Sequence, residues 1–174
     1  GHLGAAWKDG QYHRTRDFKM VKDFYYDLLK RLGTDYIDML MIHYVDEMDD
    51  LKVCLEDGIL QFALEQKQKG AARMIGIATH VPEVARAAIS TGYMDGIMFS
   101  VNPLFDLMPP DYGIDKLWNE KDSLQGQVTM DNERRDLYTL CEREGVGIVV
   151  MKAYAGGRLL GDDTPVKMTT SKCI

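Results

Sequence analysis

Short, nearly continuous apolar runs alternate with amphipathic segments along the chain, and this alternation restricts its fold more than any other feature. The apolar runs cover residues 36–43, 73–79, 95–101 and 146–151. Runs of this length are typical of parallel strands buried on both faces, because such strands have no polar side. The segments between them have helical spacing, so the pattern predicts a parallel sheet with crossover helices.

Capping residues and glycines set the expected bounds of the helices. Thr15 or Asp17 can cap a helix that ends before Gly33, because a side-chain oxygen accepts from the first free N–H groups and glycine readily adopts the left-handed conformation. By the same reasoning, further helices are expected from Asp57 to Lys69, from Pro82 to Gly92, and from about Asp131 to Glu144.

Two segments are expected to lack regular structure. The acidic run at 46–50 is expected to be a solvated loop after a strand. Residues 102–130 contain Pro103, Pro109 and Pro110 without a clear apolar period, so we expect a long loop there. Loops of this length are commonly functional lids or disordered segments, and the sequence leaves both open.

Two architectures contain such a sheet: an open doubly wound sheet and a (β/α)8 TIM barrel. No G-x-G-x-x-G follows a strand, so the dinucleotide-binding form of the open sheet loses its main support. A whole barrel needs about 250 residues, and this chain of 174 supplies about five of eight βα units. Residues 3–6 look like the exit from a strand and residues 171–174 like the start of a helix. We therefore expect one domain over residues 1–174, a partial barrel and a fragment.

Composition argues against several classes of partner. The net charge of −6, from 27 acidic and 21 basic residues, disfavours nucleic acid and leaves no polybasic stretch for a membrane surface. The apolar runs are too short to span a bilayer, and the first residues lack the pattern of a signal peptide. Cys54, Cys141 and Cys173 match neither a disulfide framework nor a zinc pattern, which favours a reduced, cytoplasmic setting.

Three of the four histidines occupy comparable places in the expected sheet. His2 precedes a strand exit, His43 ends a strand, and His80 directly follows one. In a parallel barrel these are positions on the C-terminal rim, where side chains from several strands converge. One histidine in a strand is more often a hydrogen-bonded core residue, but three on one rim favour a functional site.

Two chemistries would use these histidines. As neutral imidazoles, all three with Asp46 or Asp106 could hold a divalent metal and lower the pKa of its water. Alternatively, one histidine could donate a hydrogen bond to a substrate carbonyl while a cofactor delivers hydride. Spacing does not decide between them, because the chain contains no H-x-H or H-x-x-x-H.

Residues 32–43 read Leu-Gly-Thr-Asp-Tyr-Ile-Asp-Met-Leu-Met-Ile-His and resemble the aldo-keto reductase signature, L-G-x-D-Y-I-D-L-x-x-I-H. In that family the signature ends a barrel strand with a catalytic histidine. Residues 70–77 resemble the family's G-K-x-R-x-I-G-V, residues 144–149 its E-x-G-I-x-V, and residues 155–160 the glycine loop that follows. The segments stand in family order and correspond to the third through seventh strands.

The resemblance implies a (β/α)8 barrel that reduces aldehydes or ketones with NADP(H) or NAD(H). His43 would be catalytic and would orient the substrate carbonyl through a ring N–H. His2 stands where the family has a lysine, and we expect it to be the second catalytic residue. At an ordinary pKa of about 6.5, His2 would be mostly neutral at pH 7. The family's catalytic Asp and Tyr would lie upstream of Gly1.

The resemblance also assigns cofactor and substrate positions. The expected cofactor-binding residues are Ala78, Thr79, Met98, Met151, Lys152, Ala153, Tyr154 and Gly156. Met98 replaces the family's glutamine, and Met151 replaces the tyrosine that stacks on the nicotinamide. Trp7 and His80 are expected to contact substrate. Residues 1–4 (Gly-His-Leu-Gly), the pair Thr79-His80 and Met151 together look more like a divergent branch of the family that carries an iron–sulfur segment. Because no C-x-x-C is present, any such cluster would bind beyond Ile174.

We therefore expect an NAD(P)H-dependent oxidoreductase acting on a small carbonyl compound, with the 174-residue chain inactive alone. One alternative is a metal-dependent barrel hydrolase that uses His2, His43 and His80. The other is a non-catalytic binding protein on a degenerate reductase fold, which the departures at His2 and Met151 favour. Self-association is also expected, because a partial barrel would leave its inward-facing apolar side chains in water. These side chains are expected to be the inward-facing members of a set that contains residues 39–42, Ile75, Ile77, Ile97, Phe99 and Val149.

Overall fold

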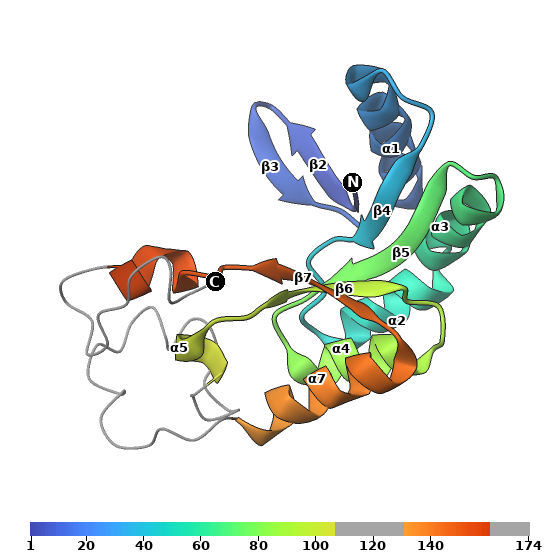
Figure 1. Ribbon diagram of the computed structural model, residues 1–174. Coiled ribbons are helices and arrows are strands. Elements are labelled where there is room, and N and C mark those ends of the chain that lie inside the picture. Colours follow the sequence, from blue (N-terminus) through green and yellow to red (C-terminus); the bar gives the residue numbers. More distant parts are fainter. Residues whose placement is uncertain (107–130, 161–174) are drawn as a thin grey trace.

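The computed structural model describes residues 1–106 and 131–160 (Figure 1). Most of the long loop expected over 102–130 lies outside the described residues, and only its first part, with the short helix α5 (Pro103–Asp106), is described. The strands are β1 (His2–Leu3), β2 (Ala5–Lys8), β3 (Gln11–Arg14), β4 (Ile37–Ile42), β5 (Ala72–Ala78), β6 (Gly96–Ser100) and β7 (Gly147–Met151). The other helices are α1 (Phe18–Leu32), α2 (Met48–Glu56), α3 (Ile59–Gln68), α4 (Pro82–Ser90), α7 (Asn132–Glu144) and the 3-10 segment η1 (Ala155–Leu160).

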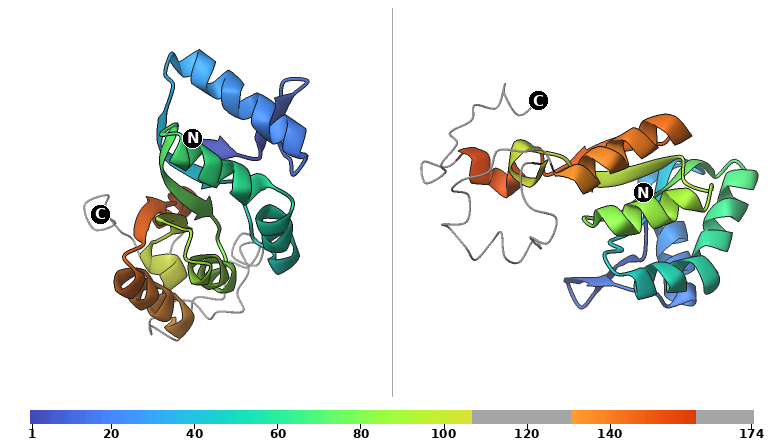
Figure 2. Two further views of the ribbon diagram at one scale, coloured as in Figure 1. Left: turned by 90° about the vertical axis from the view of Figure 1, so that its right-hand side faces the viewer. Right: turned by 90° about the horizontal axis from the view of Figure 1, so that it is seen from below.

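Five strands form one parallel sheet in the order β1-β4-β5-β6-β7, with helices in the connections between successive strands of the chain. The helices α1, α3, α4 and α7 lie along one side of this sheet (Figures 1 and 2). Because all five strands are parallel, their carboxyl ends meet at one edge. The expected parallel α/β sheet is confirmed, and it corresponds to part of a barrel.

Side chains alternate between the two faces of the sheet, and the large aliphatic ones lie on the helix side. Leu40, Ile42, Ile75, Ile77, Ile97 and Phe99 are all fully buried in the core with the helices. The expectation that the last four would be left in water is therefore wrong, because an alternating strand gives the helices only one of its two side-chain sets. Only Val149 of that expected set is exposed.

The helix-free face of the sheet is lined by methionine and glycine. A Cβ on Gly76 would lie 2.5 Å from the Met41 sulfur and would also collide with the carbonyl oxygen of Gly96. Met41 itself is only 2% exposed. Flexible methionine side chains thus fill the space above glycine backbone, which gives a dense face without large branched residues.

The capping signals of α1 are confirmed. The Asp17 carboxylate accepts a hydrogen bond from the Met20 N–H at 2.8 Å, and Gly33 is left-handed with φ 66°. The carboxylate of Asp131 caps α7 in the same way.

The acidic run at 46–50 is not the expected solvated loop. Met48 begins helix α2, and Asp49 and Asp50 lie in its first turn, where carboxylates favour the positive end of the helix dipole. Asp57 was expected to cap the next helix, but it is the C-cap residue of α2. Gly58, with φ 93°, is the N-cap residue of α3. The acidic residues therefore start a helix that the sequence pattern did not show.

A hairpin precedes α1. Strands β2 and β3 pair antiparallel, with Trp7 opposite Tyr12. The connecting residues Asp9 and Gly10 both have positive φ, 52° and 76°. This is the geometry that Asp-Gly favours in two-residue hairpin turns.

Candidate active site

The carboxyl ends of β1, β4 and β5 bring the three expected rim histidines to one edge of the sheet. His2 lies in β1 opposite Met41, His43 directly follows β4, and His80 follows β5. The backbone fixes the first two, because the N–H of His43 donates to the Leu3 carbonyl at 2.8 Å. The rim position inferred from the sequence is thus a property of the fold.

His2 and His43 are in direct contact. Their Nδ1 atoms are 2.9 Å apart, and the rings meet edge to face with centroids 4.8 Å apart. Burial lowers the pKa of His43 to about 4, helped by the nearby charges of His2, Arg16 and Arg14. Burial also lowers the pKa of His2. Both imidazoles are therefore neutral at neutral pH and act as hydrogen-bonding groups.

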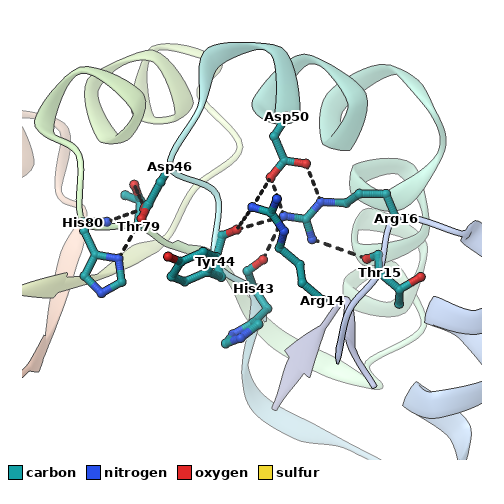
Figure 3. A network of polar contacts seen from close by, with 9 residues as sticks. All are labelled: Arg14, Thr15, Arg16, His43, Tyr44, Asp46, Asp50, Thr79 and His80. Carbon is teal, nitrogen blue, oxygen red and sulfur yellow. Dashed lines mark hydrogen bonds and ion pairs between the residues drawn. The ribbon is translucent and has the colours of Figure 1, made fainter. Parts of the chain in front are cut away.

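A network of arginine and aspartate holds the backbone around His43 (Figure 3). Arg16 makes a two-pronged ion pair with Asp50, at 2.7 and 2.6 Å. The same guanidinium donates to the carbonyl oxygens of His43 at 2.9 Å and Tyr44 at 3.0 Å, and Arg14 adds a bond to the latter. Tyr44 has φ 50°, a conformation that costs a non-glycine residue about 1 kcal/mol. The arginines offset this cost and fix the turn after His43.

His80 belongs to a separate group with Asp46 and Thr79 (Figure 3). The Asp46 carboxylate accepts from the Thr79 hydroxyl at 3.1 Å and the His80 backbone N–H at 2.7 Å, and pairs with His80 Nδ1 at 2.9 Å. Burial alone would raise the pKa of Asp46, but the hydrogen bonds from His80 and Thr79 outweigh it and lower that pKa. Asp46 is thereby held as a carboxylate.

Aromatic rings connect the two groups and continue onto the hairpin. The Tyr44 ring lies between His43 and His80, with centroids 6.2 and 5.4 Å away. On the other side of His43, Tyr12 lies 5.6 Å away and Trp7 a further 6.4 Å from Tyr12. Trp7 is 64% exposed, so it borders the site from the hairpin and does not close it.

The expected cofactor residues come from the neighbouring strand ends. Met98 pairs with Ala78, and its carbonyl oxygen accepts from the Thr79 N–H at 3.1 Å. Thr79 is fully buried, and Ala78 is 5% exposed. Met151 pairs with Ser100 at the end of β7. Ala78, Met98 and Met151 therefore share the helix-free face near the rim.

The segment after β7 has an irregular backbone. Lys152 and Ala155 have positive φ, 54° and 49°, as do Gly156 and Gly157. The Asn102 side chain donates to the Lys152 carbonyl at 2.9 Å and anchors the start of this segment. Among the residues that the structure describes, a Cβ on Gly157 would meet no atom within 4 Å.

The metal-site hypothesis is not favoured. Within residues 1–106 and 131–160, no three His, Cys, Asp or Glu side chains are placed to hold a metal ion. His80 is paired with Asp46, apart from the other two histidines, and Asp106 is paired with Arg134 and hydrogen-bonded to Tyr138. The three rim histidines thus do not form one ligand set.

Four residues that the structure places in the site were not predicted from the sequence: Arg14, Arg16, Tyr44 and Asp50. Two signals could have found the charged ones. Arg14-x-Arg16 directly precedes the helix cap Asp17, and the acidic run directly follows His43. Opposite charges that flank elements meeting at one rim are candidates for an ion pair. Among the described residues, no helix is long and apolar enough to cross a membrane.

Comparisons with known proteins agree with this fold. A search of curated proteins gives no match. The holo form of aldo-keto reductase AKR11C1 from Bacillus halodurans is 24% identical with a TM-score of 0.61, over 91% of this chain and 43% of that chain. Glycerol dehydrogenase AKR11B4 from Gluconobacter oxydans is 16% identical with a TM-score of 0.61, over 98% of this chain and 45% of that one.

A Bombyx mori aldo-keto reductase in complex with NADP is 21% identical with a TM-score of 0.50, over 91% of this chain and 42% of that chain. The chain thus spans less than half the length of each of these three structures. The family model described as "Aldo/keto reductase family" matches residues 8–172. The chain therefore belongs to the aldo/keto reductase family.

Proposed function

We propose that these residues form the carbonyl-binding part of an NAD(P)H-dependent reductase that acts on a small aldehyde or ketone. The observation that carries this is the neutral His43 imidazole at the carboxyl end of β4, held by His2 on one side and by the Arg16 network behind it. With Nδ1 bound to His2, the ring nitrogen left for a substrate is Nε2. A neutral N–H at this atom polarises a carbonyl without carrying a charge of its own.

The helix-free face offers a surface to a nicotinamide ring. Half-buried Met98 and Met151 present polarizable thioethers there to a flat ring. Lys152, Ala153, Tyr154 and Gly156 would hold the pyrophosphate. The cofactor, when bound, supplies the hydride. The Bombyx mori relative with bound NADP supports this assignment.

Two of the expected cofactor residues have a different part in this proposal. The Thr79 side chain is fully buried, and its single O–H is already used as a donor to Asp46, while the oxygen accepts from the Val81 N–H. Thr79 and the buried Ala78 would therefore shape the wall beside Met98 and leave the amide of the cofactor to other groups. Trp7 and His80 would border the substrate from the hairpin and from β5.

The branch with an iron–sulfur segment and the inactivity of the chain alone stay predictions. The first concerns residues beyond Ile174. The second rests on the family's catalytic Asp and Tyr, which would lie upstream of Gly1. The hydrolase and the non-catalytic binding protein are not favoured.

Fluorescence titration of NADPH with the 174-residue chain tests cofactor binding, and NADPH oxidation with a small aldehyde tests turnover. In a longer protein that contains these residues, we expect His43→Ala to lower kcat/KM by about 10²-fold or more. His13→Ala is the matched control, because His13 is exposed on β3. Turnover that survives His43→Ala, with the melting temperature lowered, would make His43 a structural residue and contradict the proposal.

A further inference from the structure

Two arginines share one carboxylate at the rim, and the sharing is unequal. Arg14 and Arg16 both reach the carboxylate of Asp50 (Figure 3). Arg16 holds it through two short bonds, at 2.7 and 2.6 Å, whereas Arg14 approaches it only to 3.4 Å. These three side chains together have one positive charge in excess. The excess belongs to Arg14, because a two-pronged pair with Arg16 already uses both oxygens of Asp50.

Arg14 is also the more accessible of the two cations. Its side chain is 37% exposed, against 15% for Arg16. The atom Nη1 of Arg14 donates to the Tyr44 carbonyl at 3.2 Å, and the guanidinium carbon lies 5.5 Å from the centroid of the Tyr44 ring. Within residues 1–106 and 131–160, both hydrogen bonds of the Arg14 side chain use this same nitrogen. Its Nε and its other terminal nitrogen therefore remain to donate to a ligand.

The hairpin of β2 and β3 presents Arg14 on the side of the site. Tyr12 and Arg14 are two residues apart in β3, so the alternation of a strand places both on one face of the hairpin. The ring of Tyr12 meets the ring of His43, with centroids 5.6 Å apart. Lys8 of β2 is opposite Gln11, the neighbour of Tyr12, and therefore lies on the other face. The hairpin thus carries one cation toward His43 and one away from it.

We propose that Arg14 binds a carboxylate of the substrate, an inference that rests on the proposed function. The substrate class is then an oxo acid, a small aldehyde or ketone that also carries a carboxylate. The planar fork of a guanidinium matches the two oxygens of a carboxylate, so the pair gives direction as well as affinity. With its carboxylate at Arg14, the substrate presents its carbonyl end to His43. Arg14 selects and orients the substrate, and the chemical step is left to other groups.

Two aldehydes with the same carbon chain test this in a longer protein that contains these residues. Succinic semialdehyde carries a carboxylate, and butanal does not. We expect Arg14→Gln to lower the ratio of their kcat/KM values, succinic semialdehyde over butanal, about 10-fold, because hydrogen bonds to a charged group are lost. A weaker hold on the Tyr44 carbonyl affects both aldehydes alike and cancels in the ratio. Lys8→Gln removes the same charge from the other face and should leave the ratio unchanged.

The wild-type protein supplies a second measurement that does not depend on the folding of a variant. Salt screens an exposed ion pair, so raising the ionic strength should raise the KM for succinic semialdehyde and leave that for butanal nearly constant. The same ratio in folded Arg14→Gln as in the wild type, an equal fall in Lys8→Gln, or a KM ratio that salt does not change overturns the carboxylate site.

Butyrate tests the site without cofactor or turnover. In an NMR titration of the 174-residue chain with sodium butyrate, we expect saturable shifts of the Tyr12 and Tyr44 ring signals. The shifts should persist in Lys8→Gln, be lost in Arg14→Gln, and be absent with butanol. Equal shifts in Arg14→Gln overturn the carboxylate site. A protein that binds butyrate through Arg14 but reduces neither aldehyde contradicts the proposed function alone, whereas one that reduces both without dependence on Arg14 contradicts the carboxylate site alone.

Discussion

The two halves of the sheet differ in how completely their side chains are buried. The closed half contains β1, β4 and β5, and the open half contains β6 and β7. In β4 and β5, the helix-facing residues Leu40, Ile42, Ile75 and Ile77 are fully buried, and Met41 closes the other face. In β7, Val149 is 38% and Val150 53% exposed. Both halves have apolar sequences, so composition does not explain the contrast. The helices α1, α2 and α3 contribute buried residues to the core around β4 and β5. Between β6 and β7, α7 is the only helix whose described residues join the core.

In the proposed function, this contrast would coincide with a division of chemical roles. His2, His43 and His80 all come from the closed half, where strand ends and ion pairs fix their positions. Met98, Met151 and the glycine loop, which we propose as cofactor residues, come from the open half. Orienting a small carbonyl requires fixed geometry, whereas an extended cofactor requires an accessible face.

The largest expected effect concerns the Arg16–Asp50 pair of the closed half. Their side chains are only 15% and 11% exposed, so Asp50→Asn leaves a nearly buried guanidinium with its charge uncompensated. We expect it to lower the free energy of unfolding by about 3 kcal/mol. Asp38→Asn is the control, since the Arg73–Asp38 pair is 61% and 64% exposed and should contribute less than about 1 kcal/mol. Urea unfolding measures both, and equal losses would contradict the contrast.

A smaller effect is expected from adding one methyl group to each half. In Gly76→Ala the new Cβ meets the Gly96 carbonyl oxygen and the Met41 sulfur, and we expect a loss of about 1–3 kcal/mol. In Gly147→Ala the nearest atom is the Asp95 oxygen at 3.7 Å, an ordinary contact, so the change should stay within about 0.5 kcal/mol. Thermal unfolding of the two variants tests this. A tolerated Gly76→Ala would show that the closed half has unfilled space.

A third prediction concerns the open half as an association surface. Strand β7 is the last strand of the described sheet and exposes two valines, so we expect self-association of the chain at micromolar concentration. Val150→Lys should shift the sedimentation coefficient toward the monomer and leave the melting temperature nearly unchanged. Tyr93→Lys, at a residue 49% exposed away from any strand, should have no effect on association. A wild-type chain that sediments as a stable monomer would contradict this prediction.

Elements with local signals could be predicted from the sequence. Asp17 and Gly33 bound α1 because capping and left-handed glycine depend on a few neighbouring residues. The strand ending at His43 was found in the same way, from a continuous apolar run. Its rim position followed, since parallel strands end at one edge.

The parts that failed depend on contacts between distant residues. Helix α2 begins at Met48 behind Glu47, which makes no side-chain cap bond, so the usual start signal is absent. Asp50 is held by Arg16, 34 residues away, and no local pattern shows this pairing. The prediction also placed the wrong side chains of β5 and β6 on the inner face of the sheet. A continuous apolar run does not reveal which of its alternating side chains face the helices. Asp9-Gly10, by contrast, is a local hairpin signal, although no hairpin was predicted from it.

The last prediction is a pH dependence of stability that originates in the closed half. The pKa of folded His43 is about 4, below its ordinary value of 6.5. Between these values, His43 binds a proton in the unfolded chain but stays neutral in the folded chain. The free energy of unfolding should therefore fall as pH drops from about 6.5 toward 4. The lowered pKa of His2 adds in the same direction, whereas the stabilisation by the Asp46 carboxylate is lost only at lower pH, below the ordinary 3.8 of that group. His43→Gln should therefore reduce the slope over this window while leaving it unchanged above pH 7. Urea unfolding at a series of pH values measures the slope, and equal slopes in the two proteins would show that His43 is no more buried than an exposed histidine.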